Sequence, residues 1–240
     1  MSGNEARSLI LAHSSDVHVD DDDRPAQRGG LPGLAAVLRT AVARSADILL
    51  LAGDTFDHGR VGGPALTGVR RILAAAPIHV VVLPGNHDPL LGQSIFERAG
   101  LHDLPQVHIL GLTEEESFYL PDHGIEIHGR AHRDFADMPP MPEPRPRVLP
   151  RQVIIAHGHY VPASEWERQS HRAWRISDAA LSAGGADYIA LGHWDRPTAV
   201  GNEAARAYYS GSPDLAETVN IVRLTTSEPA QVTRTPLLWA

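Results

Sequence analysis

Residues 47–54 read DILLLAGD, in which Asp47 is followed by an unbroken apolar run that ends in a glycine and a carboxylate. A short apolar run closed by a turn residue is typical of a strand that is buried on both faces. Residues 78–88, IHVVVLPGNHD, repeat this design, with apolar residues followed by a polar cluster. We therefore expect two buried strands, each ending in side chains that are able to do chemistry.

Three further apolar segments run into polar residues in the same way. They are residues 8–13 (SLILAH) before Asp16 and His18, residues 152–156 (QVIIA) before His157, and residues 187–191 (DYIAL) before His193. Amphipathic segments separate the first three strands: residues 34–42 and 65–75 each carry apolar residues at the spacing of one helical face. Alternating strands and helices imply an α/β fold with parallel strands. Because ligands bind beyond the carboxyl ends of such strands, we expect the five polar clusters to converge on one edge of one sheet.

The second half of the chain is less helical. Residues 107–110, 117–120 and 125–128 indicate short antiparallel strands, and the tail from 207 to 238 indicates strands again. Residues 138–150 (MPPMPEPRPRVLP) are dense in proline, which favours an exposed extended loop. A chain of 240 residues suits one generous α/β domain, so we expect a single domain over residues 1–240.

The composition limits the kinds of site and partner. Cysteine is absent, so any metal is held by oxygen and imidazole rather than by thiolate. The net charge of −8 and the absence of lysine argue against a protein that coats nucleic acid. No apolar run is long enough to span a bilayer, and residues 1–10 lack the pattern of a secretory signal. We expect a cytoplasmic protein with no membrane partner, while its oligomeric state stays open.

The residue types at the strand ends fit metal-assisted hydrolysis of a phosphate ester. Two cations about 3.5–4 Å apart acidify a bridging water and neutralise the phosphoryl oxygens. Asp54, at the end of the middle strand, is the candidate carboxylate that bridges them. Taken alone, an Asp after a strand is often a helix cap, and an Asn after a Gly is often a turn residue. The convergence of all these residues favours the dinuclear site.

The order and spacing of these blocks resemble the calcineurin-like metallophosphoesterases. The blocks are Asp16-x-His18, Gly53-Asp54, Gly85-Asn86-His87-Asp88, His157 and Gly192-His193. The resemblance implies a four-layer α/β/β/α sandwich, with two mixed sheets flanked by helices. Residues 53–57 (GDTFD), 84–88 (PGNHD) and 209–213 (YSGSP) resemble the DNA-repair exonuclease branch typified by SbcD and Mre11.

The resemblance also assigns roles to individual residues. It implies that Asp16 and His18 bind the first metal, that Asp54 bridges, and that Asn86, His157 and His193 bind the second metal. It implies that His87 is not a ligand but lies near the scissile phosphate as a general acid or charge stabiliser. We expect Asp88 to orient His87, since an imidazolium beside a carboxylate has a raised pKa and can protonate the leaving alkoxide.

One position departs from the family pattern. The last family motif is Gly-His-x-His, with its second histidine on the first metal, but this chain has Asp195 there. A carboxylate is a good ligand for hard ions, so direct ligation by Asp195 would favour Mn or Mg over Zn. The alternatives are a contact through water, or a weakly filled first site. We expect two divalent ions, with Mn as the first choice and Fe, Mg, Zn or Ni as the others.

Substrate contacts are predicted at three further positions. His159 lies two residues after His157, and Trp194 lies inside the last motif. Asp57 follows Asp54 closely enough either to face the substrate or to support a metal ligand from behind.

Three functions remain in competition. The first is an enzyme, a metallophosphoesterase that hydrolyses phosphodiesters through a dinuclear centre and a bridging hydroxide, with a phosphate ester as its partner. The second is a DNA exonuclease or endonuclease of the SbcD/Mre11 type. In that branch a DNA-recognition cap and a segment that docks on an ATPase follow the catalytic domain, whereas only a short tail follows residue 213 here. The third is a non-catalytic metal-binding scaffold. The charge and the short tail place the general phosphodiesterase first and nucleic acid second.

Overall fold

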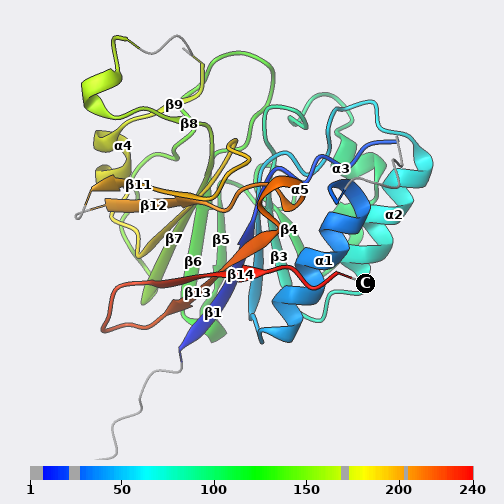
Figure 1. Cartoon of the computed structure of the whole chain (residues 1–240), viewed down its shortest axis with the longest axis horizontal. Helices are drawn as coiled ribbons and strands as arrows, with labels where there is room; N and C mark the ends of the chain where they lie inside the picture. The colour runs from blue at the N-terminus through cyan, green and yellow to red at the C-terminus, as the bar shows by residue number, and fades with distance from the viewer. Residues whose placement is uncertain (1–7, 22–27, 169–172, 203–204, 240) are drawn as a thin grey trace, which may run out of the picture.

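The computed structural model describes residues 8–21, 28–168, 173–202 and 205–239, and within them two six-stranded sheets face one another. Figure 1 shows the layers in order, from α4 (Asp178–Ala183) on the left, through the two sheets, to α1 (Gly30–Ala43) and α2 (Gly63–Ala74) on the right. The fold is the four-layer α/β/β/α sandwich with two mixed sheets that the resemblance implies, and this prediction is confirmed.

The first sheet has the strand order β14-β13-β1-β2-β3-β4. Its strands are β1 (Leu9–Ser14), β2 (Ile48–Ala52), β3 (His79–Leu83), β4 (Val107–Ile109), β13 (Thr218–Leu224) and β14 (Gln231–Pro236). Strands β1 to β4 pair in parallel, whereas β13 pairs antiparallel with both β1 and β14. The short helix α5 (Pro213–Ala216) precedes β13.

The second sheet has the strand order β11-β12-β10-β7-β6-β5. Its strands are β5 (Ser117–Leu120), β6 (Ile125–Gly129), β7 (Arg151–His157), β10 (Tyr188–Gly192), β11 (Thr198–Asn202) and β12 (Ala205–Tyr209). The central pairs are parallel and the two edge pairs are antiparallel. A small parallel pair, β8 (His159–Tyr160) and β9 (Arg175–Ile176), lies beyond the end of β7.

The side chains of β2 alternate between two hydrophobic cores. Leu49 and Leu51 pack with α1 and α2 on the outer face of the first sheet, whereas Ile48 and Leu50 pack between the two sheets. Side chains of a strand alternate with a period of two, so a strand covered on both faces needs apolar residues at every position. This double burial explains the unbroken apolar run of residues 48–52. A third core lies under α4, where Leu181 packs on the outer face of the second sheet.

The predicted strands at the five polar clusters are confirmed to within one residue, but two expectations about the sheets are wrong. Strand β4 is not antiparallel: it pairs parallel with β3, because α3 (Ile95–Arg98) and the 3-10 helix Leu101–Asp103 return the chain before β4 begins. The polar clusters also do not end on one sheet, since β1, β2 and β3 belong to the first sheet and β7 and β10 to the second. Strands β5 and β6 pair antiparallel as predicted.

The proline-rich loop, residues 138–150, carries neither helix nor strand and is mostly exposed, as predicted. It is nevertheless tied to the second sheet. The Arg147 guanidinium donates to both carboxylate oxygens of Asp187 at 2.7 and 3.1 Å, and the Val148 amide donates to the buried carboxylate of Glu126. Met141, near the start of the loop, is buried in the core under α4.

The prediction that the chain has no secretory signal used residues 1–10, and residues 1–7 of these lie outside the described residues. Among the residues that are described, no helix is long and apolar enough to cross a membrane.

Candidate metal centre

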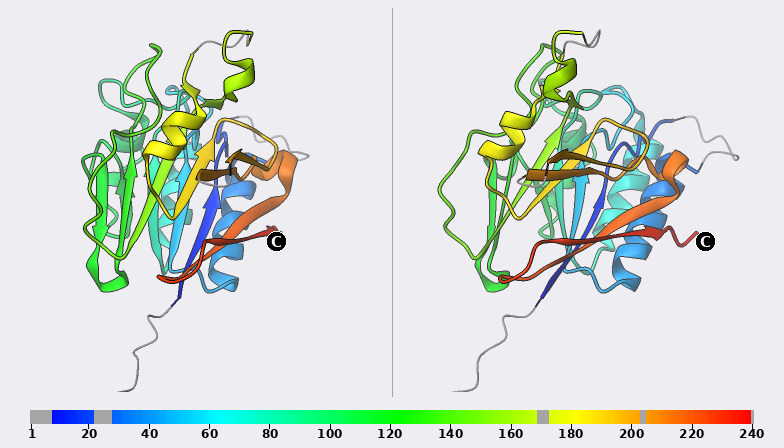
Figure 2. Two further views of the ribbon diagram at one scale, coloured as in Figure 1. Left: turned by 90° about the vertical axis from the view of Figure 1, so that its left-hand side faces the viewer. Right: turned by 60° about the vertical axis from the view of Figure 1, so that its left-hand side comes forward.

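The polar loops after β1, β2 and β10 are bonded to one another by their backbones. The Asp16 amide donates to the Gly53 carbonyl and the His18 amide to the Asp54 carbonyl, each at 3.1 Å. The His193 amide, from the second sheet, donates to both carboxylate oxygens of Asp16 at 3.1 and 3.0 Å. The site therefore lies across the seam between the two sheets. In Figure 2 the yellow-green segment that carries β8 projects at the same, upper end of the molecule.

Two glycines at this seam leave no room for a side chain. A Cβ on Gly192 would lie 1.8 Å from the Ala52 carbonyl oxygen, and a Cβ on Gly53 would lie 2.0 Å from His157 Nδ1. Asp54 itself adopts a φ of 52°, in the left-handed region that few non-glycine residues enter. The Gly-Asp and Gly-His dipeptides of the sequence therefore reflect the close approach of the two sheets.

The ligands assigned to the second metal form one compact cluster. Asn86 Oδ1 lies 3.0 Å from His157 Nε2 and 3.1 Å from His193 Nδ1. Asp54 Oδ2 lies 3.0 Å from His157 Nε2, and ligand atoms of Asp54, His157 and His193 all lie within 4.8 Å of one another. The four predicted residues are thus brought together from β2, β3, β7 and β10.

The ligands assigned to the first metal form a looser cluster beside it. Ligand atoms of Asp16, His18 and Asp54 lie within 4.8 Å of one another, with His18 Nε2 4.0 Å from Asp54 Oδ2. The other Asp54 oxygen, Oδ1, accepts a hydrogen bond from the His87 amide at 2.9 Å. Asp54 Oδ2 is therefore common to both clusters, which is the position that a bridging carboxylate needs.

The hydrogen bonds of these residues fit a cation. His157 Nδ1 donates to the Ala52 carbonyl at 2.8 Å, so in the neutral ring that a metal ligand requires, the lone pair of Nε2 faces Asn86 Oδ1, which is itself an acceptor. Two acceptors at 3.0 Å repel unless a positive charge lies between them. Ligand atoms about 3 Å apart are also the spacing expected around an ion that lies about 2.1 Å from each.

Burial and charge act in opposite directions on the pKa values of this group. Burial alone would lower the pKa of His157, but the carboxylates of Asp54 and Asp16 outweigh it and raise that pKa to about 10. Burial alone would raise the pKa of Asp54, but His157 outweighs it and holds that pKa below its usual range. The pKa of Asp16 is raised by burial. The centre therefore stabilises a positive charge between Asp54 and His157.

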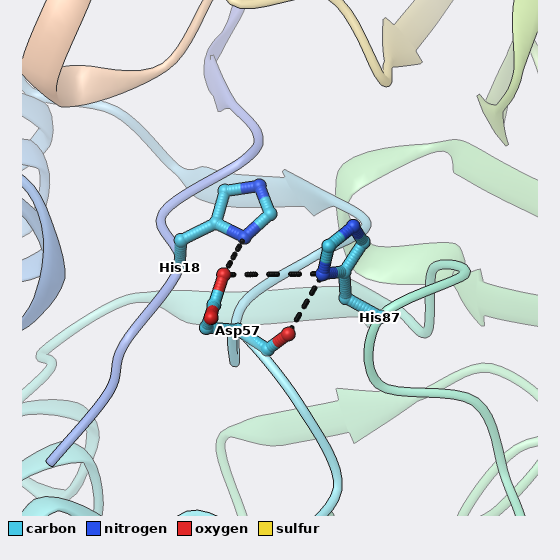
Figure 3. Close-up of side chains that lie close together, drawn as sticks. All are labelled: His18, Asp57 and His87. Atoms are coloured by element: carbon cyan, nitrogen blue, oxygen red, sulfur yellow. Dashed lines mark hydrogen bonds and ion pairs between the residues drawn. The ribbon is translucent and has the colours of Figure 1, made fainter.

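Asp57 connects the two remaining histidines, as Figure 3 shows. Its carboxylate oxygen Oδ1 lies 2.8 Å from His18 Nδ1 and 3.8 Å from His87 Nδ1, and its carbonyl accepts from His87 Nδ1 at 2.7 Å. Because Asp57 holds the proton on Nδ1 of His18, it leaves Nε2 of His18 free to bind a metal. The outer ring nitrogens of both histidines point to the same side, away from Asp57.

The structure places Asp88 elsewhere than beside the ring of His87. The Asp88 carboxylate is fully buried and accepts from the amides of Gly85 at 2.7 Å and Phe56 at 3.0 Å. Burial and the nearby Asp54 raise its pKa to about 7. These contacts make Asp88 a support for the loop after β3, whereas the group that accepts from the His87 ring at 2.7 Å is the backbone carbonyl of Asp57.

Asp195 is exposed, and its carboxylate is not part of any group of three ligand atoms within 4.8 Å among the described residues. It lines a cavity of about 420 Å³ together with Asp16, Asp20, Asp57 and Asp214, which we call the acidic cavity. The position is consistent with a contact to the first metal through water, and direct ligation stays a prediction.

His159 and Trp194, both predicted as substrate contacts, contact each other. Trp194 Nε1 donates to His159 Nδ1 at 3.0 Å, and the Trp194 ring stacks on Tyr209 with centroids 4.3 Å apart. The Tyr209 hydroxyl in turn donates to the Gly158 carbonyl at 2.7 Å. This stack supports the loop that carries His157 from behind.

Two further residues lie near the centre, of which the sequence favoured a surface or loop position for His132 and offered Trp174 only as one of several rings able to stack on a base. His132 is fully buried, and its Nε2 lies 3.0 Å from the His157 carbonyl, while burial lowers its pKa to about 4. The Trp174 ring lies 5.5 Å from the His132 ring and 6.0 Å from the His193 ring. His132 follows the strand predicted at residues 125–128, but the alternating polar residues of that strand gave no sign of a buried strand end, and Trp174 lies in an irregular segment.

Comparison with known proteins agrees with this geometry. The sequence model of the calcineurin-like phosphoesterases matches residues 9–197. One solved crystal structure is similar at 14% identity, with a TM-score of 0.60, over 95% of this chain and 100% of that chain. The crystal structure of the protein TT1561 of Thermus thermophilus is similar at 12% identity, with a TM-score of 0.59, over 95% of this chain and 99% of that one. Identities this low show the fold alone, and no curated protein matches the sequence.

The family match covers the whole span that carries the ligand clusters, from Asp16 to His193. Metal-dependent hydrolysis of phosphate esters is the chemistry of that family, and the His and Asp clusters are compatible with it. This chain belongs to the calcineurin-like phosphoesterases.

Proposed function

We propose that the protein hydrolyses phosphodiesters at a dinuclear centre whose two divalent ions share Asp54. The observation that carries the proposal is the position of Asp54 Oδ2, which faces His157 Nε2 at 3.0 Å in one cluster and His18 Nε2 at 4.0 Å in the other. Divalent ions bound there would supply an acidified water and would neutralise charge on the phosphoryl oxygens.

The chain's own residues prepare the remaining steps. Asp54 and Asn86 on the first sheet, with His157 and His193 on the second, fix where the phosphate group binds. His87 keeps its Nδ1 proton on the Asp57 carbonyl at 2.7 Å and presents its other ring nitrogen to the site. In its protonated form, His87 can donate the Nε2 proton to the leaving oxygen. His87 is therefore the proposed general acid.

The donor set supports manganese as the preferred ion. Among the described residues, the acidic cavity adds the carboxylates of Asp20, Asp195 and Asp214 to those of Asp16 and Asp57, which also line it. Carboxylate-rich surroundings favour hard ions over zinc. Mn is the proposed metal, and Fe, Mg, Zn and Ni are the ions to compare with it.

A substrate panel tests the proposal. The purified chain, stripped of metal and reloaded with Mn, is assayed on bis-p-nitrophenyl phosphate, on p-nitrophenyl phosphate, and on labelled single- and double-stranded DNA. We expect metal-dependent turnover of the diester that exceeds turnover of the monoester. DNA cleavage at low enzyme concentration would place a nuclease first, and no turnover of any phosphate ester with any of the five ions would leave only the scaffold.

A further inference from the structure

A second cavity, of about 530 Å³, borders the centre and shares Asp57 with the acidic cavity. Asn86, His87 and Asp57 form its inner edge. The rest of its lining is largely apolar: Pro89, Leu91, Ile95, Phe135 and Trp174, with the polar residues His58, Gly59, Arg60 and Gln93 beside them. We call it the apolar cavity. Its volume lies within the range of about 300–1,000 Å³ that is usual for small-molecule sites.

The outer wall of the apolar cavity presents large apolar side chains to solvent. Phe135 is 67% exposed and Leu91 is 42% exposed. Neither side chain belongs to any of the three hydrophobic cores among the described residues. Large apolar groups gathered at a concave surface beside a reactive centre are typical of a ligand site.

The wall is also held in place. The Trp174 amide donates to Asp137 Oδ1 at 2.6 Å, and its indole Nε1 donates to the Ala136 carbonyl at 3.0 Å. These bonds join the segment after β6, which carries Phe135, to the segment before β9. The ring of Trp174 lies 6.0 Å from that of His193, a proposed ligand, so the wall is fixed relative to the centre.

The position of His87 gives this cavity a role. His87 lines the apolar cavity and does not line the acidic cavity. A general acid must lie within hydrogen-bond reach of the oxygen that it protonates, and that oxygen carries the leaving group. The organic group of the leaving alcohol therefore extends from His87 into the apolar cavity.

Resting on the proposed function, we infer that the apolar cavity is the leaving-group subsite and takes a planar aromatic group of a small phosphodiester. Phe135 and Trp174 supply ring surfaces for such a group, and Leu91 closes the remaining side. In the step itself, the bond between phosphorus and the leaving oxygen breaks, water supplies the new oxygen on phosphorus, and the proton on His87 Nε2 goes to the leaving oxygen.

The experiment compares two methyl phosphodiesters on the Mn-loaded full-length chain. One has phenol as its leaving alcohol, and the other has a fluoroalkyl alcohol matched to phenol in acidity, so that only the flat ring differs. Stacking of one ring contributes roughly tenfold in binding or rate, so Phe135→Ala should lower kcat/KM about tenfold for the phenyl ester. The same variant should change kcat/KM less than about twofold for the fluoroalkyl ester, and Phe135→Tyr should retain activity on both.

Val148→Ala is the matched control, because Val148 is another exposed apolar side chain, 65% exposed, and lines neither cavity. It should leave both substrates unchanged. Equal losses on both esters, or no loss on the phenyl ester, would overturn the assignment of the subsite. Failure of the unaltered chain to hydrolyse either ester would instead count against the proposed function, so the two failures are distinguishable. Thermal unfolding of Phe135→Ala checks that the exposed position carries no fold stability.

Discussion

The two cavities that border the Asp54 centre differ in charge. The acidic cavity is lined by five aspartates, Asp16, Asp20, Asp57, Asp195 and Asp214, and by no arginine among the described residues. The described lining of the apolar cavity has one carboxylate, that of Asp57, and one guanidinium, that of Arg60. If a polyanion such as a nucleic-acid strand crossed the site, its phosphates would lie beside these aspartates. The repulsion between the like charges would weaken binding, even if bound cations neutralised part of the aspartate charge. The difference favours a small diester with an uncharged leaving group over a long polyanion.

The largest expected effect comes from Asp54, the carboxylate that is common to both ligand clusters. Asp54→Asn keeps the shape of the side chain but loses the charge that holds both clusters, so we expect kcat to fall by at least about a thousandfold. Elemental analysis should find fewer bound ions per chain. Asp122→Asn, at an exposed carboxylate before β6, is the control and should keep both values. Full activity in Asp54→Asn would contradict the shared centre.

The next prediction separates the cavities by their proton donor. His87→Gln should lower turnover of an alkyl-leaving diester by about a hundredfold, the usual contribution of general acid catalysis. It should lower turnover of a p-nitrophenyl diester by less than about tenfold, since that alcohol leaves without a proton. His58→Gln, which alters another histidine of the apolar cavity, should leave this ratio unchanged. A uniform loss on both esters would place His87 outside proton transfer.

A third prediction concerns the pH range in which the fold that carries both cavities is stable. His13 is fully buried and its Nδ1 lies 2.8 Å from the Tyr188 hydroxyl, so burial lowers its pKa from 6.5 to about 3. The folded state keeps His13 neutral while the unfolded state takes up a proton, so stability is present above pH 6.5 and is lost as pH falls toward 3.

We expect this group to remove about 2 kcal/mol of unfolding free energy between pH 7 and pH 5. Urea unfolding at the two pH values measures it. In His13→Gln the difference between the two pH values should shrink by about that amount, whereas His102→Gln, at an exposed histidine, should leave it as in the unaltered chain. An unchanged difference in His13→Gln would contradict the depressed pKa.

The smallest expected effect concerns the acidic cavity alone. If Asp195 binds the first metal directly or through water, Asp195→Ala should weaken one of the two ions about tenfold while the other stays bound. Titration with Mn followed by elemental analysis measures both. Asp122→Asn, at an exposed carboxylate that lines neither cavity, is the comparison and should bind as the unaltered chain does. Two ions per chain with unchanged affinity in Asp195→Ala would remove Asp195 from the metal site.

The sequence could predict the parts of this molecule that depend on local pattern. Each proposed ligand follows an apolar run closely, so the amino-acid order alone indicates the strand ends and the glycines beside Asp54 and His193. The packing of one sheet on the other could not be predicted from local pattern. The apolar residues 48–52 indicate that both faces of the strand are buried, but they do not indicate that helices cover one face and a second sheet covers the other. The parallel direction of β4 depends on short helices that no periodicity predicts.

The contacts around the centre were predicted less well, for a physical reason. The sequence left open whether Asp57 faces the substrate or supports a ligand, because its partners His18 and His87 lie 39 and 30 residues away and no spacing along the chain encodes that meeting. Phe135 and Trp174 sit in irregular segments whose placement depends on hydrogen bonds to Asp137 and Ala136. Such contacts arise from tertiary packing, which a single sequence does not display.

The seam at Gly192 has a mechanical consequence. Asp54 and Asn86 follow strands of the first sheet, and His157 and His193 belong to strand ends of the second. An ion bound by all four side chains would therefore cross-link the two sheets. Whatever binds only the closed sandwich stabilises it in proportion to the logarithm of its concentration. The supply of metal would then regulate how firmly the two halves adhere, and with it how long the protein survives heat or proteases, before any substrate arrives.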